Sequence, residues 1–367
     1  MTSTTANAVP TPNSPLAIAR PDLLQLAPYE HAAWLPELTR LHANELPWRS
    51  PGDDSEAGLN RYPEPQPQAL VQALAGLYGV PPEQVLVTRG GDEGIDLLTR
   101  AFCRAGQDSI LTSPPTFGMY PVAARVQGAG VIRVPLLAEQ GFALDEDALV
   151  AACVAGVKLV YVCSPNNPTG NLIDEALILR LAQRLSGRAL VVVDEAYIEF
   201  ADRPSVARHI PAQPWLVVLR TLSKAHALAG ARCGTVLADP AIIGLLRRIV
   251  EPYNMTQPSI EAVLRALQPA TLATARERVR QILAERTRLI EALRACPAVT
   301  RVWPSDANFV LAEFRDPQTA FDRACSAGLL VRKQRELPRC LRITVGTPDQ
   351  NRTLVQAFNP LPNQVSA

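Results

Sequence analysis

Residues 216–232 read LVVLRTLSKAHALAGAR, and this stretch holds the main structural and chemical signals of the chain. Its first four residues are apolar and include two valines, which predicts a short buried strand. Thr221, Ser223 and Lys224 follow almost at once, and Arg232 lies eight residues beyond the lysine. Hydroxyl groups and cations directly after a buried strand are typical of a ligand site at the edge of a sheet.

The same pattern recurs along the chain, with helical periods between the apolar runs. The predicted strands of this region are 85–87, 110–112, 131–134, 159–163, 190–193, 216–219 and 235–237. Strands that alternate with helices predict an α/β fold with a mostly parallel central sheet and helices on both faces. Ligands of such sheets bind beyond the carboxyl ends of the strands, so the residues that follow each strand are the candidates for function.

The length of 367 residues and the hydrophobic content of 47% predict two domains. We expect residues 1–15 to form a disordered leader and residues 16–60 an N-terminal arm that joins the small domain. Residues 61–270 are expected to form the large domain, and residues 271–367 a linking helix and a small α+β domain. The leader has neither a basic residue nor an apolar segment, which excludes a signal peptide and predicts a cytoplasmic protein.

Charge and composition exclude several classes of function. The net charge is only +1, so no field of one sign is available to attract nucleic acid or an anionic membrane. The seven cysteines form no CxxC pair and the four histidines show no ligand spacing, so we predict reduced thiols and no metal site. Only Lys158, Lys224 and Lys333 can supply a side-chain amine, because the other 33 basic residues are arginine.

Two of the post-strand segments suit a phosphorylated, planar ligand. After the strand at 85–87, a glycine-rich turn runs into a helix, where the backbone amides of Gly91, Asp92 and Glu93 can bind an anion. After the strand at 110–112, two prolines stiffen the loop before Phe117, whose ring can form a flat wall. The alternative interpretations are an ordinary turn and a core phenylalanine.

Three further segments supply polar groups of different kinds. Asn167 lies in the loop after the strand at 159–163, and its amide can reach a phenolic oxygen. Asp194 follows the next strand, 190–193, and can pair with a cation. The Asp-Glu sequence also resembles nucleotide hydrolases, but no lysine here follows a glycine as their phosphate loop requires. With the amine of Lys224, these groups are compatible with pyridoxal phosphate, a phosphorylated ring that carries a cationic nitrogen, a phenolic oxygen and an aldehyde.

Several longer strings carry a resemblance to a known family. The chain resembles the aspartate-aminotransferase-like (fold type I) enzymes that use pyridoxal phosphate, and within them the histidinol-phosphate aminotransferases. The resemblance covers about residues 41–347. The matching strings are LHANELPW, NRYPEPQ, RGGDEGIDLLTRAF, SPPTFGMY, YVCSPNNPTG, VVVDEAYIEF, RTLSKAHALAGARCG and CLRITVGT.

The resemblance implies a role for each matching residue. Lys224 would form the Schiff base with the cofactor and move the proton between the substrate and cofactor carbons. Asp194 would pair with the pyridinium nitrogen, and Tyr197 and Asn167 would hydrogen-bond to the phenolic oxygen. The other implied contacts are ring stacking by Phe117, phosphate binding by Gly91, Asp92, Glu93, Thr221, Ser223 and Arg232, a phosphate contact in the neighbouring subunit by Tyr62, and binding of the substrate's anionic end by Arg332 and Arg342.

These roles predict a homodimeric transaminase that moves an amino group between L-histidinol phosphate and 2-oxoglutarate in histidine biosynthesis. An aromatic-amino-acid aminotransferase and a phosphoamino-acid decarboxylase of the same fold are alternative activities. A regulatory protein that only senses pyridoxal phosphate is a further alternative, although the N-terminus lacks a basic DNA-binding module. The chain departs from the family pattern at Phe117, usually Tyr, at His226, usually Phe, and at His42, usually Asn.

Overall fold

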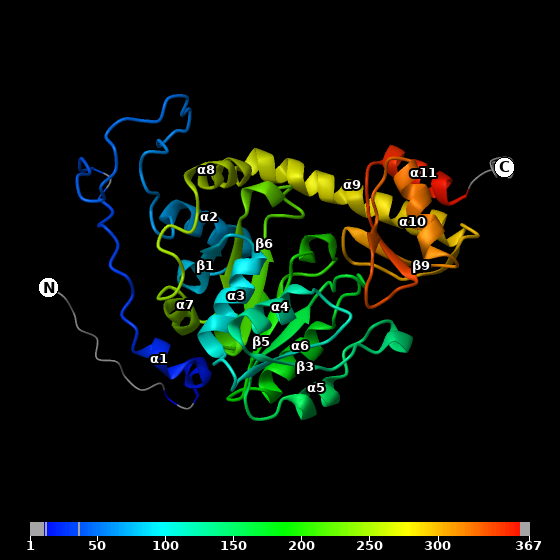
Figure 1. Ribbon diagram of the computed structural model, residues 1–367, viewed down its shortest axis with the longest axis horizontal. Coiled ribbons are helices and arrows are strands. Elements are labelled where there is room, and N and C mark those ends of the chain that lie inside the picture. The colour runs from blue at the N-terminus through cyan, green and yellow to red at the C-terminus, as the bar shows by residue number, and fades with distance from the viewer. Residues whose placement is uncertain (1–10, 12, 36, 360–367) are drawn as a thin grey trace.

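The computed structural model describes residues 11, 13–35 and 37–359, and two separate sheets organise this part of the chain (Figure 1). The larger sheet has the strand order β1-β7-β6-β5-β4-β2-β3. Its strands are β1 (Val85–Thr88), β2 (Ser109–Thr112), β3 (Gly130–Arg133), β4 (Val157–Cys163), β5 (Leu190–Asp194), β6 (Leu216–Thr221) and β7 (Gly234–Leu237). The predicted α/β fold class is confirmed.

Strand direction explains why functional residues far apart in sequence meet at one edge of this sheet. Strands β2 to β6 run parallel, whereas β7 is antiparallel to both β6 and β1. Two reversals in succession give β1 the same direction as β6. The carboxyl ends of β1, β4, β5 and β6 therefore lie on the same edge of the sheet.

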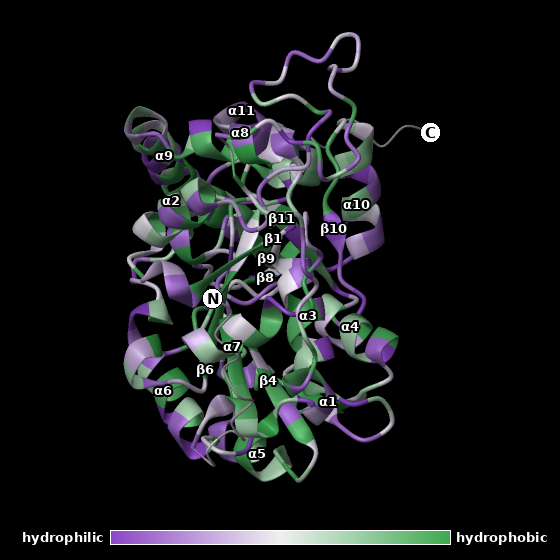
Figure 2. Ribbon diagram, turned by 90° about the vertical axis from the view of Figure 1, so that its left-hand side faces the viewer, coloured by the Kyte–Doolittle hydropathy of each residue, from purple (hydrophilic) through white to green (hydrophobic). Residues whose placement is uncertain are grey.

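Alternating side chains along the strands bury both faces of the large sheet under helices (Figure 2). Along β4, Val160 and Val162 belong to the core that includes α2 and α6, while Leu159 and Tyr161 belong to the core that includes α3 and α4. The helices around this sheet are α1 (Pro21–Leu24), α2 (Gln68–Tyr78), α3 (Gly91–Phe102), α4 (Met119–Gln127), α5 (Glu146–Ala152), α6 (Glu175–Arg184), α7 (Pro240–Leu246) and α8 (Gln257–Ala266). Both faces are covered, as the near-continuous apolar strands require.

The smaller sheet has the order β10-β11-β9-β8, and its strands are all antiparallel to their neighbours. Its strands are β8 (Val299–Val302), β9 (Phe309–Phe314), β10 (Arg332–Lys333) and β11 (Cys340–Thr344), and its helices are α10 (Pro317–Ser326) and α11 (Pro348–Phe358). The 26-residue helix α9 (Pro269–Arg294) joins the two parts of the molecule, and its last turns enter the small core through Leu289 and Leu293.

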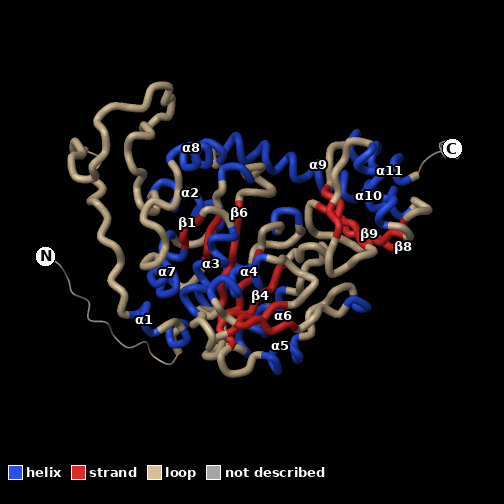
Figure 3. Tube along the Cα trace, viewed as in Figure 1, coloured by secondary structure: helices blue, strands red, loops and turns tan. Residues whose placement is uncertain are grey.

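The N-terminal segment differs from the expectation that residues 16–60 join the small domain. Ile18, Ala19 and Leu23 are buried in the core of the large sheet, because their apolar side chains pack with those of α3 and α7. Residues 25–67, as far as they are described, contain no helix or strand, and Figure 3 draws them as one extended loop. In Figure 1 this arm lies at the side of the large sheet opposite the small sheet.

The structure also bears on the predicted leader, on membrane-spanning helices and on metal-binding groups. The predicted leader, residues 1–15, lies largely outside the described residues; Pro15 begins a short 3-10 helix, Pro15–Ile18. Within the described part of the chain, no helix combines the length and the apolar character needed to cross a membrane. Nor do the described residues include a group of three or more His, Cys, Asp or Glu side chains placed to hold a metal ion.

Candidate active site

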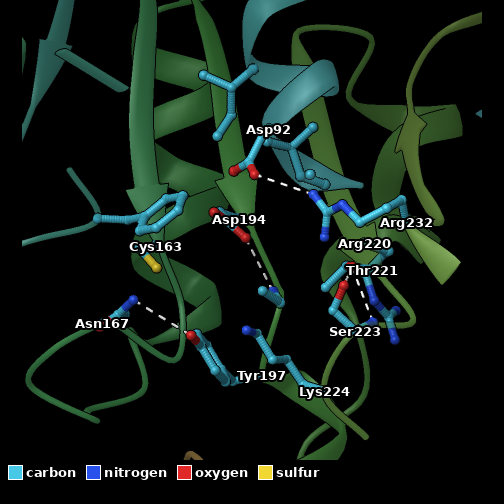
Figure 4. Close-up of a pocket in the computed structure, with 15 residues that line it drawn as sticks. Asp92, Cys163, Asn167, Asp194, Tyr197, Arg220, Thr221, Ser223, Lys224 and Arg232 are labelled. Carbon is cyan, nitrogen blue, oxygen red and sulfur yellow. Dashed lines mark hydrogen bonds and ion pairs between the residues drawn. The ribbon is translucent and has the colours of Figure 1, made fainter. Parts of the chain in front are cut away.

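A cavity of about 120 Å³ opens at the carboxyl edge of the large sheet, where β1, β4, β5 and β6 end (Figure 4). Ten of the twelve predicted cofactor-binding residues line it, and Lys224 lies among them. These ten are Gly91, Asp92, Phe117, Asn167, Asp194, Tyr197, Thr221, Ser223, Lys224 and Arg232.

One side of the cavity is suited to an anion. Helix α3 begins at Gly91 with no side-chain cap on its first turn, so the backbone amides there are open to a ligand. Arg232 lies beside this helix end, where its Nη2 donates to Asp92 Oδ2 at 3.4 Å. Thr221 and Ser223 add two hydroxyl groups that hydrogen-bond to each other at 3.0 Å. Amides, hydroxyls and a guanidinium together form a phosphate-binding set.

Close backbone packing at this side requires glycine at two positions. Gly90 has φ +91°, and a Cβ atom there would lie 2.9 Å from Nη2 of Arg232. A Cβ atom on Gly234, the first residue of β7, would lie 2.7 Å from the carbonyl carbon of Gly90. Arg232 itself has φ +50°, a left-handed conformation that costs a non-glycine residue energy and occurs mostly at functional sites. The backbone therefore holds the guanidinium against the helix end.

Asp194 lines the cavity at the end of β5, and only 7% of its surface is exposed. Its Oδ2 accepts a hydrogen bond from the Tyr120 hydroxyl at 2.8 Å, and its Oδ1 accepts one from the Ala196 amide at 3.1 Å. Burial raises the pKa of this carboxyl above its ordinary value. Within the described part of the chain no cation lies within 4.0 Å of it, so this buried acid has no salt-bridge partner there, although the more distant Lys224 favours its ionised form.

The opposite side of the cavity carries hydrogen-bond donors. Asn167 Nδ2 donates to the Tyr197 hydroxyl at 3.4 Å, and both residues are buried. Arg342, from β11 of the small sheet, donates to Asn167 Oδ1 at 2.5 Å. Burial raises the pKa of Tyr197, which keeps the phenol protonated and able to donate. This side is suited to an oxygen atom of the ligand and lies next to the small sheet.

Lys224 extends between these two sides from the loop after β6, as Figure 4 shows. Its Nζ lies 5.8 Å from the centre of the Tyr197 ring. Partial burial and the nearby Arg342 guanidinium lower the pKa of the amine. A lowered pKa increases the neutral fraction of the lysine, which is the form that attacks a carbonyl or accepts a proton.

Two of the predicted cofactor residues do not line this cavity. The Glu93 carboxylate turns away and accepts hydrogen bonds from Arg89 and Asn254, although the Glu93 amide still belongs to the open first turn of α3. Tyr62 lies in the extended arm, 49% exposed, with its ring stacked on Tyr253 at 4.6 Å between centroids. Neither residue contributes its side chain to the cavity in the single chain.

The sequence did not predict several other residues in or next to the cavity. Ile95, Cys163, Ala196, Leu219 and Arg220 also line it. Cys163 could have been found, because it ends β4 and pairs in register with Asp194. Tyr120 carried no such signal, because it lies within an amphipathic helix where a core role is the ordinary one.

A buried ionic network lies directly behind the cavity. The Arg220 guanidinium donates to Glu199 at 2.7 Å, lies 3.6 Å from Glu195 and stacks over the Tyr78 ring at 4.6 Å. The departure at position 226 joins this network, with His226 Nε2 at 3.9 Å from Glu199. His226 therefore faces an acid rather than a purely apolar core. Burial lowers the pKa of the imidazole.

The anion-binding groups, the carboxylate, the phenol and amide pair and the amine each occupy a separate part of the cavity wall (Figure 4). In this view Arg232, Thr221 and Ser223 lie on the right, and Tyr197 and Asn167 lie further left. Lys224 lies between them at the bottom, and Asp194 lies above Lys224. In pyridoxal phosphate the aldehyde lies between the phosphate arm and the phenolic oxygen, and the ring nitrogen is opposite the aldehyde. The residues fit this arrangement, including the missing cation at Asp194. Fold and donor groups together define the class of enzymes that act through pyridoxal phosphate.

Comparison with known proteins narrows this class. The family model for aminotransferase class I and II matches residues 41–358. The chain is 49% identical over 351 residues to the histidinol-phosphate aminotransferase of Stenotrophomonas maltophilia (strain R551-3), covering 94% of this chain and 96% of that protein. The chain therefore belongs to the class I and II aminotransferase family.

Solved structures agree with this membership. The histidinol-phosphate aminotransferase of Sinorhizobium meliloti, in complex with pyridoxal-5'-phosphate, has a TM-score of 0.74 and 27% identity, covering 82% of each chain. The aspartate aminotransferase of Thermus thermophilus with maleate has a TM-score of 0.72 and 25% identity, covering 81% of this chain and 83% of that one. The aspartate-aminotransferase-like fold and the pyridoxal phosphate cofactor are thus those expected from the sequence.

Proposed function

We propose that this aminotransferase transfers the amino group of L-histidinol phosphate to 2-oxoglutarate. The names of its relatives support this substrate, and one structural observation carries the proposal: Arg332 and Arg342 are direct cross-strand partners in β10 and β11. Residues directly opposite in an antiparallel pair project on the same face of the sheet. The two guanidinium groups thus share one region beside the cavity.

Two like charges opposite each other destabilise a sheet unless an anion lies between them. Arg342 is half-buried, and its Nε has no hydrogen-bond partner among the described residues. Burial lowers the pKa of this guanidinium, and Arg332 lowers it further. A pair of guanidinium groups can fork hydrogen bonds to a carboxylate or to a phosphate dianion, so one pocket can serve both substrates.

The surroundings of Arg332 also suit a substrate with a second charge. Arg332 lines an adjoining cavity of about 280 Å³, which shares Phe117 with the first cavity and also contains Arg133 and Arg335. Exposed cations at the entrance favour the approach of a dianion over that of an uncharged aromatic side chain. The phosphate of histidinol phosphate would be bound on this side, while its amino end reaches Lys224.

The chain's own residues account for the catalytic roles in this proposal. Pyridoxal phosphate, when bound, supplies an electron-withdrawing ring that stabilises the charge left as a proton leaves the substrate. Lys224 anchors the cofactor and moves that proton at its Nζ, aided by its lowered pKa. Asp194 holds a cationic nitrogen, while Tyr197 and Asn167 donate hydrogen bonds on the opposite side from Arg232. The phosphate side fixes the orientation of the ring.

A donor comparison tests the substrate. Purified enzyme is assayed with 2-oxoglutarate and, in turn, histidinol phosphate, phenylalanine and aspartate, and kcat/KM is measured for each donor. We expect histidinol phosphate to exceed both others by at least about tenfold, because it alone places a dianion near the arginine pair. A preference for phenylalanine would identify an aromatic-amino-acid aminotransferase, and release of carbon dioxide from a phosphoamino acid would identify a decarboxylase.

We also propose that the enzyme is a homodimer in which the arm of each subunit covers the other. Ten large hydrophobic side chains of this arm are exposed in the single chain, more than monomeric proteins ordinarily leave in one segment. They are Leu26, Tyr29, Trp34, Leu35, Leu38, Leu41, Leu46, Trp48, Leu59 and Tyr62. Within the dimer, Tyr62 would contact the cofactor phosphate of the partner.

Hybrid dimers test the shared site. Lys224→Ala and Tyr62→Ala proteins, each strongly impaired, are mixed and allowed to exchange subunits. One site of the hybrid then contains a native lysine and a native tyrosine, so activity should partly return. A mixture of Lys224→Ala and Asp194→Asn is the matched control, because both residues serve the same site and no native site can form. Equal recovery in both mixtures would count against Tyr62 acting across the interface.

The proposal also includes the division of the chain into domains and its cellular location. The division into residues 61–270 and 271–367 is supported by the two sheets, each of which lies entirely within one of these ranges. A cytoplasmic location is supported by the seven cysteines, all of which carry free thiols.

A further inference from the structure

Tyr120 is a buried residue that contacts two walls of the cofactor cavity without lining it. It lies in the first turn of α4 and is fully buried. Its hydroxyl donates to Asp194 Oδ2 at 2.8 Å, and its ring meets Phe117 edge-on, with 5.7 Å between the centroids and 82° between the planes. One side chain thus connects the carboxylate expected to bind the ring nitrogen with the aromatic ring expected to cover the cofactor.

In this hydrogen bond Tyr120 is the donor and Asp194 the acceptor. Burial raises the pKa of Tyr120 well above the ordinary value, so the phenol remains protonated and can only donate to the carboxylate. A donor favours the ionised form of its acceptor, which opposes the effect of burial on Asp194. Five other titratable groups interact electrostatically with Asp194: Cys163 and Tyr161 of β4, Asp92 of α3, Tyr197 after β5 and Lys224 after β6.

The position of the Tyr120 hydroxyl is itself held by packing. The Tyr120 ring stacks on the Tyr161 ring, with 4.6 Å between centroids and 11° between planes. The Tyr161 hydroxyl points elsewhere and donates to the Ile95 carbonyl at 3.3 Å. The two tyrosines therefore have the same depth and neighbouring rings but different hydrogen-bond acceptors.

We propose that Tyr120 is a positioning residue of the aminotransferase site, which keeps Asp194 in the ionised form and in the orientation that binds the cationic ring nitrogen. The second contact, with Phe117, holds the covering ring at the same time. This inference rests on the proposed function of Asp194 and Lys224. It assigns a role to a residue that contacts two lining residues of the cofactor cavity but does not line the cavity itself.

Cofactor binding to the apoprotein tests the inference. Wild type, Tyr120→Phe and Tyr161→Phe are freed of cofactor and titrated with pyridoxal phosphate at a series of pH values, and Kd is measured by absorbance. We expect Tyr120→Phe to raise Kd roughly ten- to a hundredfold, the usual effect of losing a hydrogen bond to a charged group. The Tyr161→Phe control should change Kd less than about threefold.

The pH dependence separates a positioning role from a packing role. Without its donor, Asp194 takes up a proton at higher pH, so in Tyr120→Phe the acid-side loss of cofactor affinity should begin at higher pH than in wild type. A Tyr120→Phe protein with wild-type Kd and wild-type pH dependence would overturn the proposal. So would equal effects of the two tyrosine variants.

A double-variant comparison completes the test. If the hydroxyl acts through the carboxylate charge, adding Tyr120→Phe to Asp194→Asn should raise Kd less than about threefold, far less than in the wild-type background. An undiminished effect in the Asp194→Asn background would overturn the proposal. Failure of wild type to bind pyridoxal phosphate, or a borohydride adduct away from Lys224, would instead remove the proposed function, and the role of Tyr120 with it.

Discussion

Two buried acidic regions meet at the end of β5, and their charges are arranged differently. Glu195 belongs to a closed network, in which it accepts from Ser205 at 2.5 Å and from the Val206 amide at 2.8 Å, with Arg220 nearby. Asp194, its neighbour in sequence, receives two neutral donors and has no cation within the described part of the chain at salt-bridge distance. Burial raises the pKa of both carboxyls.

The difference distinguishes a structural site from a functional one. The Arg220 guanidinium lies within 4.0 Å of both Glu195 and Glu199, so these two carboxylates have a counterion inside the protein. Among the described residues, neither Asp194 nor the Arg332–Arg342 pair has a salt-bridge partner, and we expect the cofactor and the substrate to supply the opposite charges. Burial of an unpaired charge costs stability, so its presence at the edge of the sheet indicates that a ligand completes it.

The largest effect is expected at the amine. Lys224→Ala removes the nucleophile and the group that moves the proton, so turnover should fall by roughly 10³-fold or more while the fold is retained. Lys158→Ala, remote from the cavity, is the matched control and should keep its activity. Borohydride reduction followed by mass spectrometry should place the cofactor on Lys224; an adduct on Lys158 or Lys333 would refute the assignment.

Next in size is the contrast between Asp194→Asn and Arg220→Met. Asp194→Asn should cost about 2–5 kcal/mol of transition-state stabilisation, since it removes one partner of a buried charge pair. Arg220→Met should reduce cofactor binding less than Asp194→Asn does but destabilise the protein by about 3–5 kcal/mol, because Glu195 and Glu199 lose their counterion. The measurements are kcat/KM and denaturant unfolding of the two variants.

The pH dependence of the apoprotein sharpens this contrast. Because the folded-state pKa of Asp194 is raised, its contribution to stability is greatest below the ordinary value of 3.8 and declines as pH rises through the folded-state pKa. At neutral pH the Asp194→Asn apoprotein should therefore be at least as stable as wild type. A clear loss of stability in this variant would mean that a cation of the protein compensates Asp194. Asp194 would then not differ from Glu195 in this respect.

At the arginine pair, a comparable effect on activity is expected for Arg342 and a smaller one for Arg332. Arg342→Leu should reduce kcat/KM for histidinol phosphate and for 2-oxoglutarate, again by about 2–5 kcal/mol, because Arg342 is the more buried of the two. Arg332→Leu, at an exposed position, should cost about 1 kcal/mol and affect histidinol phosphate more than phenylalanine. Equal losses on both donors for Arg332→Leu would remove its proposed phosphate role.

The smallest effect is expected at His226, on the edge of the closed network. Burial lowers the pKa of this imidazole, so its contribution to stability is present above the ordinary value of 6.5 and is lost as pH falls through the folded-state pKa. His226→Phe should cost less than about 1.5 kcal/mol at pH 8 and should abolish this acid-side loss. Unfolding curves at pH 8 and pH 5.5 measure both quantities; an unchanged pH dependence would place the titration elsewhere.

The sequence by itself determined the fold class and the position of most site residues. Lys224, Asp194 and Asn167 each follow a recognisable apolar strand, and parallel strands bring their carboxyl ends to one edge. These positions could be predicted because an apolar strand is recognised from adjacent residues alone, and parallel strands always end at the same edge of a sheet. The first turn of α3 could be predicted in the same way, from a glycine-rich turn before a helical period.

Only the tertiary structure decided which distant side chains meet. Tyr120 and Asp194 are 74 residues apart, and their contact depends on which face of the sheet α4 covers. The pairing of Arg332 with Arg342 depends on the register of a two-residue strand that periodicity cannot detect. The burial of Ile18, Ala19 and Leu23 in the core of the large sheet likewise depends on residues that several elements bring together. Long-range contacts of this kind depend on packing, and a local pattern of residue types does not encode them.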